Sequence, residues 1–502
     1  MAKTKEKAEF GDFQTPEALA AEVCALLAKL GCKPASIIEP TCGQGNFLFA
    51  ALNQLTTASH AIGIDVSADY IAIAQSRLIR KSKINADVKI LQGSFFDTDW
   101  DSLVKHQPSP LLVIGNPPWV TNAELGTLGS SNIPKKENFQ NHSGFDALTG
   151  KSNFDISEWM LIRILHWLTG KDATLAMLCK TAVARKILTH AWKNEITISH
   201  SAIYRIDALA HFDASVDACL LVCQFAPFAR NLDTLVYSDL AATKPEQTIG
   251  YRDGGVVASI ERYDLWKHLR SYENSKWRSG IKHDCSKVME LTREGDHYRN
   301  GLGELVLLES DYLFPMMKSS EIANGAELAP KRWMLVTQKN VRDDTALIKD
   351  IAPNTWKYLQ AHGGLLDKRA SSIYKNRARF SVFGIGEYSF AKWKVSISGF
   401  YKKFNFKVIG SYENKPIVLD DTSYFIPCET KREADYIASL LNAPEAKYFF
   451  ESFVFWDAKR PITVDLLRRL DLATLERELG RKTPFMFALT NNNLTQHQPS
   501  LI

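Results

Sequence analysis

The first half of the chain alternates short apolar segments with segments of helical periodicity, and this alternation limits the fold more than any other feature. The apolar runs have the length of strands, and the segments before and between them carry apolar side chains at helical spacing. The expected strands are residues 36–39, 61–65, 88–91 and 113–115, and the expected helices are residues 17–30 and 67–80. Such an alternation predicts a parallel sheet with right-handed helical crossovers, which binds ligands at the carboxyl ends of its strands.

The first expected strand ends at Glu39 and runs into a turn that contains Gly43 and Gly45. Two glycines let a ligand approach the backbone closely, as in dinucleotide-binding turns. However, the third glycine of that pattern is absent, and Glu39 would repel a pyrophosphate, which disfavours NAD and ATP. The carboxylate attracts a cation instead, and S-adenosylmethionine combines an adenosine with sulfonium and ammonium groups. A second carboxylate, Asp65, ends the next strand, where doubly wound folds hold a ribose.

The fourth expected strand runs into Asn116-Pro117-Pro118-Trp119. The two prolines fix the backbone at the edge where open α/β sheets bind ligands. The amide oxygen of Asn116 and the carbonyl of Pro117 suit the exocyclic amine of a planar base, and the indole of Trp119 offers a face for stacking. A tight turn after a core strand would need the same residues, so these four alone leave both interpretations open.

Together with residues 13–16 (FQTP) and 93–95 (GSF), these motifs resemble those of the adenine-N6-specific DNA methyltransferases. Their order resembles the type II restriction-modification enzymes in which the catalytic domain precedes the target-recognition domain. The resemblance implies α/β architecture: a Rossmann-like class I S-adenosylmethionine-dependent methyltransferase domain, followed by an α+β DNA-recognition domain. It implies S-adenosyl-L-methionine as the cofactor and double-stranded DNA as the partner.

The resemblance also assigns roles to single residues. The catalytic residues would be Asn116, Pro117, Pro118 and Trp119. The cofactor-binding residues would be Thr15, Pro16, Glu39, Pro40, Thr41, Cys42, Gly43, Gly45, Asp65, Ser94 and Phe95. Glu39 would face the methionyl part of the cofactor, Asp65 its ribose and Phe95 its adenine ring. Ser94 departs from the family, which often has an aspartate there; Asp97 or Gln92 is a candidate replacement. Without the resemblance, Thr15 and Pro16 predict only the cap and the first position of a helix.

The second half of the chain is basic. Residues 251–502 hold 38 Lys/Arg and 31 Asp/Glu, and residues 331–407 hold 16 against 5, interleaved with aromatic residues. This composition favours a polyanion as the partner, with the aromatics available for stacking or packing. The candidate DNA contacts are Lys392, Lys394, Tyr401, Lys402, Lys403 and Lys407.

The length of 502 residues predicts more than one domain. We expect a catalytic domain at residues 1–240 and a target-recognition domain at residues 250–490, joined by a linker at 241–247. The polar stretch 120–152 predicts a flap over the DNA. Near the C-terminus, residues 437–450 and 464–479 are expected to be helical.

Composition excludes several classes of protein. No apolar run reaches the length of a membrane span, and the charged N-terminus lacks the apolar core of a signal peptide. The eight cysteines form neither a CxxC pair nor a cluster with zinc spacing, which fits a reducing compartment and no metal. We expect a cytoplasmic monomer, whose cognate restriction endonuclease would be a separate chain.

Several alternative functions stay open to different degrees. Cytosine-C5 methylation needs a nucleophilic cysteine, and Cys428 lies in a predicted core strand far from the cofactor motifs. Cytosine-N4 enzymes usually carry serine at the position of Asn116. An RNA base or a protein glutamine is a further possible substrate, although the long basic half argues against a protein. Glu445 and Lys447 have nuclease-like spacing without a partner aspartate. A DNA-binding module with a decayed methyltransferase fold is the non-enzymatic alternative.

Overall fold

The computed structural model describes residues 14–80, 84–120, 155–271, 276–325 and 330–481. The chain forms two compact units, Met1–Ile260 and Glu261–Ile502, and each is described by itself. Phe13 and all but the first residue of the predicted flap lie outside the described residues. No helix among the described residues is long and apolar enough to cross a membrane.

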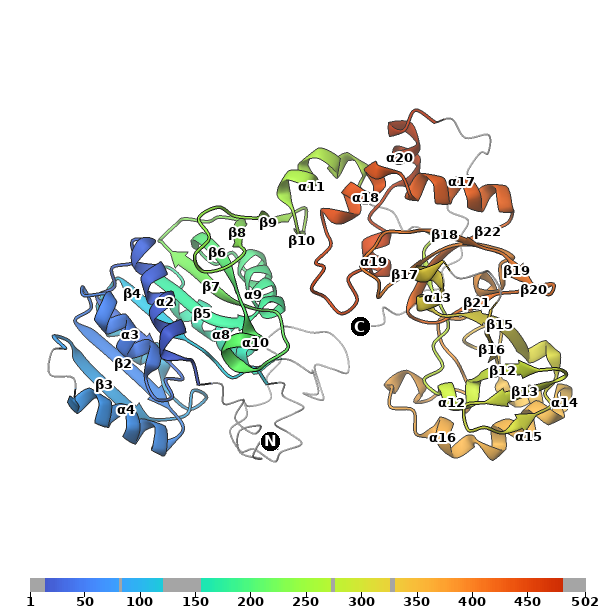
Figure 1. The fold of residues 1–502 in the computed structure, drawn as a ribbon, viewed down its shortest axis with the longest axis horizontal. Helices are drawn as coiled ribbons and strands as arrows, with labels where there is room; N and C mark the ends of the chain where they lie inside the picture. Colours follow the sequence, from blue (N-terminus) through green and yellow to red (C-terminus); the bar gives the residue numbers. More distant parts are fainter. Residues whose placement is uncertain (1–13, 81–83, 121–154, 272–275, 326–329, 482–502) are drawn as a thin grey trace. The chain divides into compact units, whose positions relative to one another are not determined.

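The first unit is built on one ten-stranded sheet with the order β10-β9-β8-β6-β7-β5-β4-β1-β2-β3 (Figure 1). Its strands are β1 (Ser36–Glu39), β2 (His60–Asp65), β3 (Asp87–Gln92), β4 (Leu111–Gly115), β5 (Ala173–Lys180), β6 (Ile198–Ile206), β7 (Ala218–Phe225), β8 (Asp233–Tyr237), β9 (Gln247–Arg252) and β10 (Gly255–Val257). Strands β1 to β5 pair in parallel, as predicted, and β7 runs antiparallel between β5 and β6. The carboxyl ends of β1, β2, β3 and β4 therefore meet at one edge of the sheet.

Helices cover both faces of this sheet (Figure 1). They are α2 (Glu17–Lys29), α3 (Asn46–Gln54), α4 (Ala68–Arg80), α5 (Trp100–Lys105), α8 (Ile156–Leu168), α9 (Thr181–Lys193) and α10 (Ala208–Phe212). Buried residues of α2, α3 and α4 share one core with alternate residues of the central strands, such as Ile37 and Leu112. Because successive strand residues face opposite sides, Ile38 and Val113 are buried on the other face. Both faces of the sheet are buried, which explains why the sequences of these strands are continuous apolar runs.

Two details of the first unit correct the sequence prediction. Residues 241–246, within the predicted linker, connect β8 to β9, and both strands belong to the large sheet. The boundary between the units lies instead at Ile260. Helix α2 begins at Glu17, and its N-terminus has no side-chain cap. Thr15 therefore does not cap it; its carbonyl accepts a hydrogen bond from Asn46 Nδ2 at 2.7 Å.

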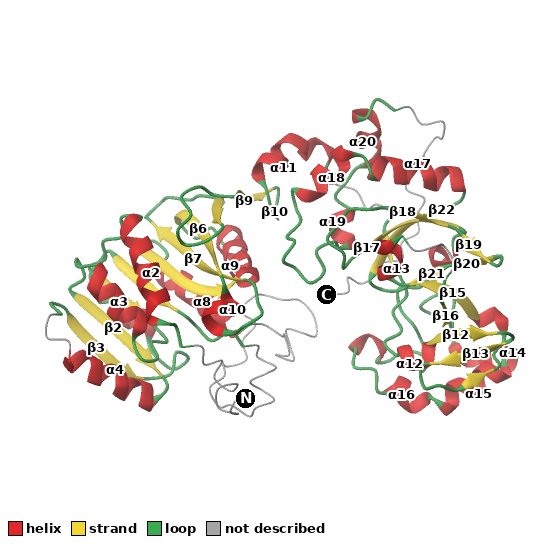
Figure 2. Ribbon diagram, in the orientation of Figure 1, coloured by secondary structure: helices red, strands yellow, loops and turns green. Residues whose placement is uncertain are grey.

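The second unit is an α+β assembly with a six-stranded sheet (β14-β13-β12-β16-β15-β21), a four-stranded sheet (β11-β22-β17-β18) and a hairpin (β19-β20) (Figure 2). The strands are β11 (Arg278–Ser279), β12 (Glu290–Glu294), β13 (His297–Asn300), β14 (Leu305–Val306), β15 (Leu313–Met317), β16 (Arg332–Leu335), β17 (Trp393–Ser398), β18 (Lys407–Ile409), β19 (Ser411–Tyr412), β20 (Lys415–Pro416), β21 (Val418–Leu419) and β22 (Ser423–Cys428). The α-helices are α11 (Ile260–Trp266), α12 (Ser286–Met289), α13 (Ser319–Asn324), α14 (Ile348–Ile351), α15 (Pro353–Ala361), α16 (Gly363–Asp367), α17 (Lys431–Leu441), α18 (Pro444–Glu451), α19 (Val464–Leu467) and α20 (Leu472–Glu478).

Both long helices predicted near the C-terminus are interrupted. Residues 437–450 fall on α17 and α18, because Pro444 cannot continue a helix and instead opens the next one. Residues 464–479 fall on α19 and α20, and Asp471 caps α20 by accepting the N–H of Thr474 at 2.6 Å. Apolar spacing alone could not locate these breaks, since the apolar pattern continues across them.

Candidate active site

The turn after β1 is held by backbone hydrogen bonds and by two glycines. Gly43 and Gly45 have φ of +49° and +79°, a backbone conformation that residues other than glycine rarely adopt. The N–H of Cys42 donates to Ile64 O at 2.9 Å, and the N–H of Gly45 donates to Cys42 O at 2.7 Å. A β-carbon on Gly43 would lie 2.6 Å from Gln14 Oε1, so the segment before α2 closes directly over the turn.

Asp65, at the end of β2, ties this turn to the neighbouring strand. Its Oδ2 accepts the N–H of Gly43 at 2.8 Å, and its Oδ1 accepts the N–H of Ser67 at 2.9 Å. The carboxylate therefore has a structural role that the sequence prediction did not include. Its contact with a ribose stays a prediction.

Glu39 is buried at the centre of the edge, with 3% of its surface exposed. Its Oε2 accepts the N–H of Leu48 at 2.8 Å. Burial raises the pKa of Glu39 well above its ordinary value, and the nearby Asp65 charge raises it further. A β-carbon on Gly115 would lie 3.5 Å from Glu39 Cγ, which places the carboxyl group beside the residue that precedes Asn116.

Sequence reasoning missed Arg77 on α4, which organises the same turn. Its Nη1 donates to Gln44 O at 2.8 Å and to Asn46 Oδ1 at 2.5 Å, and its Nη2 pairs with Glu17 at 2.6 Å. The guanidinium also lies 5.0 Å from the centroid of the Phe49 ring. An arginine on the polar side of a helix gave no signal in the sequence, because its partners come from three other segments.

The turn has features that fit a bound cofactor. The hydroxyl oxygen of Thr41 is buried and has no hydrogen-bond partner among the described residues. Thr41 stands between Glu39 and the two glycines in the sequence, and a polar ligand at this turn would satisfy its hydroxyl. Cys42 is buried, and burial together with Glu39 raises the pKa of its thiol, which therefore stays protonated. Cys42 thus contributes packing rather than a nucleophile.

Ser94 and Phe95 follow β3, next to Asp65. The N–H of Gly93 donates to Asp65 O at 2.9 Å, and Ser94 Oγ accepts the N–H of Phe96 at 3.1 Å. Phe95 is only 6% exposed, and its ring has aromatic neighbours within 6.0 Å. These neighbours are Phe96, Trp100, Trp159 and Trp167. The ring of Phe95 is thereby fixed, and its contact with the cofactor adenine stays a prediction.

The turn Asn116-Pro117-Pro118-Trp119 leaves the end of β4 at the same edge. Asn116 and Pro118 are half-buried and Pro117 is buried. Trp119 is 5% exposed and packs edge-to-face against Phe212 on α10, with ring centroids 5.2 Å apart. The structure therefore gives the indole a contact in the core, and its stacking on a base stays a prediction.

The end of the Asn116–Trp119 turn is held by residues that the sequence did not single out. Lys180, the last residue of β5, donates from Nζ to Trp119 O at 3.1 Å. The same ammonium pairs with Asp155 Oδ2 at 2.7 Å. Because the three residues come from separate elements, only the fold reveals this arrangement.

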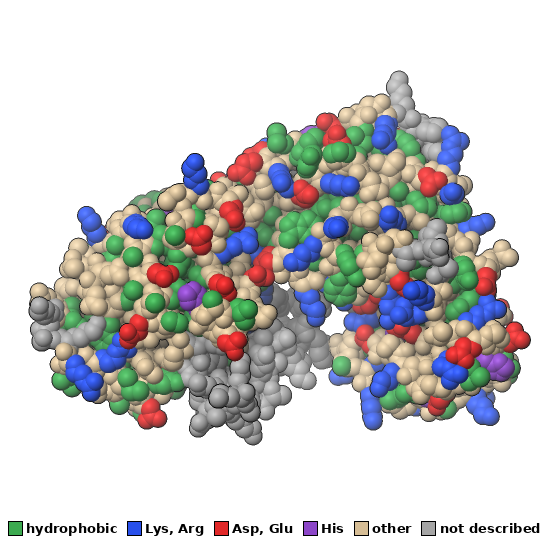
Figure 3. Space-filling model, in the orientation of Figure 1, with side chains coloured by type: hydrophobic (Ala, Val, Ile, Leu, Met, Phe, Trp, Pro, Cys, Tyr) green, Lys and Arg blue, Asp and Glu red, His purple; other side chains and the backbone are tan. Residues whose placement is uncertain are grey.

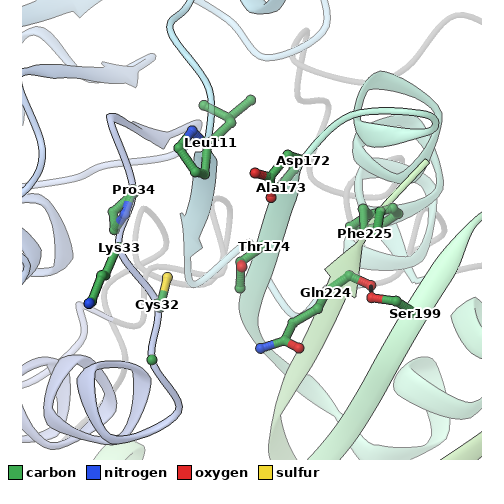
Figure 4. Close-up of a pocket in the computed structure, with 13 residues that line it drawn as sticks. Cys32, Lys33, Pro34, Leu111, Asp172, Ala173, Thr174, Ser199, Gln224 and Phe225 are labelled. Carbon is green, nitrogen blue, oxygen red and sulfur yellow. Dashed lines mark hydrogen bonds between the residues drawn. The ribbon is translucent and has the colours of Figure 1, made fainter. Parts of the chain in front are cut away.

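A pocket of about 320 Å³ lies at the opposite edge of the sheet (Figure 4). It is lined by residues at the amino ends of β1, β4 and β5, among them Cys32, Leu111 and Thr174. None of the predicted cofactor or catalytic residues lines this pocket. This pocket is therefore separate from the predicted cofactor and catalytic residues, which lie at the carboxyl edge of the sheet.

The candidate DNA contacts in the second unit differ in exposure. Lys392, Tyr401, Lys402 and Lys403 are exposed, and Lys407 is half-buried. Lys and Arg side chains are spread over the face of this unit seen in Figure 3. Several of the interleaved aromatics, including Phe380, Phe404 and Phe406, are buried, so these provide packing rather than stacking.

Lys394 was predicted as a DNA contact, and this prediction is wrong. Its side chain is 1% exposed within β17, and its Nζ donates to Ala391 O at 2.5 Å. Residues 394–398 of β17 are all buried, so Lys394 is enclosed with its strand, while Lys392, two residues earlier, precedes the strand and is exposed. Burial lowers the pKa of Lys394 to about 7.

Two rival sites lack support in the part of the chain that the structure describes. Cys428 is buried in β22, and burial raises the pKa of its thiol to about 12, which disfavours a nucleophilic role. Glu445 lies in α18, and no group of three or more metal-ligating side chains occurs among the described residues.

Comparison with known proteins decides the family. A model described as a methyltransferase domain matches residues 33–107, which hold β1 to β3 and the glycine turn. The Type II methyltransferase M.NspV from Nostoc sp. (strain ATCC 29411 / PCC 7524) is 44% identical over 474 residues, covering 94% of this chain and 98% of the relative. The chain belongs to the type II methyltransferases.

The fold of this type II methyltransferase has a solved counterpart over both units. The Type IIL restriction-modification enzyme MmeI, solved in complex with DNA, aligns with a TM-score of 0.56 and 13% identity. The alignment covers 93% of this chain and 68% of that enzyme. At this identity the likeness shows the fold alone. The predicted α/β methyltransferase domain is confirmed by the matching domain model and by the observed sheet.

Proposed function

We propose that this type II methyltransferase transfers the methyl group of S-adenosylmethionine to the N6 amine of adenine at a specific site in double-stranded DNA. Such a modification would protect the site from a separately encoded restriction endonuclease. The observation that carries the proposal is the placement of the Asn116 turn. It leaves the sheet at the edge that also holds Glu39, Thr41 and the glycine turn.

The cofactor would lie against the β1–α3 turn. Glu39 would face its cationic methionyl part, Thr41 would use its unsatisfied hydroxyl, and Gly43 would let it approach the backbone. When bound, S-adenosylmethionine supplies an electrophilic methyl group on a sulfonium. The protein has no need of a nucleophile of its own, which agrees with the protonated state of the Cys42 thiol.

The catalytic turn would act on the adenine amine by positioning it. That amine is a poor nucleophile because its lone pair is delocalised into the ring. Hydrogen bonds from N6 to the Asn116 amide oxygen and to the Pro117 carbonyl would favour a pyramidal nitrogen and direct its lone pair at the methyl group. Positioning of this kind supplies up to about 7–11 kcal/mol of the barrier.

Adenine must leave the duplex before it can reach the turn, at a cost of a few kcal/mol. The second unit would hold the DNA meanwhile, through exposed basic residues such as Lys402 and Lys403. Contacts between basic side chains and phosphates give an affinity that depends on the salt concentration and does not depend on the base sequence.

Cytosine N4 is the alternative amine, because it has the same donor geometry. The asparagine at position 116 favours adenine, since cytosine-N4 enzymes usually carry serine at the corresponding position. The proposal therefore rests on a single side chain for its choice of base.

The test is to incubate the protein with mixed-sequence DNA and methyl-labelled S-adenosylmethionine, digest the DNA and identify the labelled nucleoside. We expect N6-methyldeoxyadenosine, and sequencing of the modified positions would then reveal the site. Label in N4-methyldeoxycytidine would overturn the choice of base. Parallel reactions with RNA and with protein complete the test, because label there and none in DNA would overturn the substrate.

A further inference from the structure

An ion pair joins three elements at the end of the catalytic turn. Lys180 is the last residue of β5, and its ammonium lies 2.7 Å from Asp155 Oδ2 and 3.1 Å from Trp119 O. The Lys180 side chain is 26% exposed and that of Asp155 is 9% exposed. The ammonium thus bridges a backbone carbonyl of the turn and a largely buried carboxylate.

Asp155 is itself fixed by the start of α8. Its Oδ1 accepts the N–H of Ser157 at 3.0 Å and the hydroxyl of Ser157 at 2.5 Å, which makes Asp155 the cap of the helix. The N–H of Ile156 donates to Val120 O at 2.9 Å. The residue that follows Trp119 is therefore bound to the same helix start.

Helix capping explains Asp155 but does not explain Lys180. An aspartate satisfies a helix N-terminus without a cationic partner, and withdrawing a lysine from water to meet it costs free energy. The ammonium is placed where it also holds Trp119 O, and Trp119 is the last residue of the catalytic turn. The ammonium therefore holds the backbone carbonyl of Trp119 beside the end of β5 and the carboxylate that caps α8.

We propose that Lys180, held by Asp155, is a positioning residue that keeps the Asn116 turn in the geometry needed for methyl transfer. This inference rests on the proposed function of that turn. Lys180 does not touch the reacting atoms; it acts through the backbone of Trp119. A displacement of a reacting group by about 1 Å costs roughly 10²-fold in rate, so a small shift of the turn has a large effect.

A second ion pair between neighbouring helices provides a matched control. Lys186 on α9 lies 2.7 Å from Glu158 Oε2 on α8, and the Glu158 side chain is 2% exposed. This pair has the same length as Lys180–Asp155 and joins α8 to the helix that follows Lys180. The ammonium of Lys186 binds a side chain of α8, whereas that of Lys180 also binds the backbone carbonyl of Trp119.

The experiment measures single-turnover methyl transfer to DNA with labelled S-adenosylmethionine, together with cofactor affinity, DNA affinity and thermal stability. The variants are Lys180→Met, Lys180→Gln, Lys180→Arg, Asp155→Asn and Lys186→Met. We expect Lys180→Met to lower the rate by about 10–100-fold while both affinities stay within about twofold. Lys180→Arg should restore most of the rate, because it keeps the charge and the donors. Lys186→Met should lower stability only.

Coupling gives a readout that a merely structural role would not produce. Lys180→Met and Asp155→Asn should lower the rate no further together than Lys180→Met does alone, because they interrupt one connection. A rate for Lys180→Met within twofold of the wild type would overturn the proposal, as would an equal loss of rate in Lys186→Met. If Lys180→Met does not fold, Lys180→Gln decides, since it keeps a donor for Trp119 O without the charge. A wild-type protein that labels no DNA would refute the proposed function instead.

Discussion

Glu39 in the first unit and Lys394 in the second are both buried ionisable residues, but their positions in the fold suggest different roles. Glu39 ends β1 in the first unit, is 3% exposed, and has a pKa raised by burial. Lys394 lies within β17 in the second unit, is 1% exposed, and has a pKa lowered to about 7 by burial. Each side chain has a hydrogen bond to one backbone group, Leu48 N–H for Glu39 and Ala391 O for Lys394. In both residues, burial shifts the pKa in the direction that favours the neutral form, so burial and pKa alone do not distinguish them.

Their surroundings separate them. Glu39 lies at the carboxyl edge of parallel strands, beside Gly115 and the glycine turn, where α/β sheets bind ligands. Lys394 is flanked by β18 and β22 in a small antiparallel sheet, with the Phe425 ring 5.7 Å away. A perturbed pKa therefore indicates a functional site only where the residue also lies at a position that can bind a ligand, such as the carboxyl edge of a parallel sheet. We expect Glu39 to matter for activity and Lys394 only for stability.

The largest expected effect is at the same edge as Glu39. Asn116→Ala removes the acceptor that we propose for the adenine amine, and it should lower the rate of methyl transfer by at least about 10²–10³-fold, the usual cost of losing one transition-state hydrogen bond. DNA affinity should stay nearly intact. Asn116→Asp keeps acceptor oxygens and should retain more of the rate. Normal turnover with weakened DNA binding in Asn116→Ala would show that the carboxyl edge is not the catalytic site.

Glu39→Gln should weaken S-adenosylmethionine binding by about tenfold, which is about 1.4 kcal/mol. The same variant should raise the unfolding temperature of the cofactor-free protein. Because burial raises the pKa of Glu39, ionisation lowers stability as the pH rises above the unfolded value, and glutamine lacks this loss. Thermal unfolding with and without cofactor measures both effects. If the wild type and Glu39→Gln bind the cofactor with equal affinity at every pH, Glu39 matters only for stability, as we expect for Lys394.

The sequence predicted the carboxyl edge well because its signals are local. Strand ends, glycines and the Asn116 turn each lie within a few consecutive residues, and parallel pairing brings them together. Arg77, Phe212 and Lys180 were missed because their partners are distant in sequence. Lys394 was misassigned because composition reports the basic charge of a segment but not which side chains turn inward.

Lys394→Met should stabilise the second unit at neutral pH. The folded pKa of about 7 lies below the ordinary 10.5, so the unfolded chain binds the extra proton and stability rises with pH between these values. Methionine removes this slope, and the gain near pH 7 should exceed about 1 kcal/mol. Urea unfolding at pH 7 and pH 10 measures the difference. The exposed neighbour Lys392→Met is the control and should change neither stability nor slope. A wild-type slope that persists in Lys394→Met would assign the titration to another group.

The smallest expected effect is on the exposed surface of the second unit. Removing charge at Lys402 and Lys403 should weaken DNA binding and lower the slope of log Kd against log salt by roughly 0.9 for each lost phosphate contact. Methyl transfer at saturating DNA should be unchanged, in contrast to Asn116→Ala. The matched control is Lys349→Ala with Lys357→Ala, which removes the same charge from exposed positions of α14 and α15 in the same basic segment. A lower slope in the control and not in Lys402→Ala/Lys403→Ala would move the DNA surface to the helices. Equal slopes in all variants would show that net charge, rather than particular contacts, attracts the DNA.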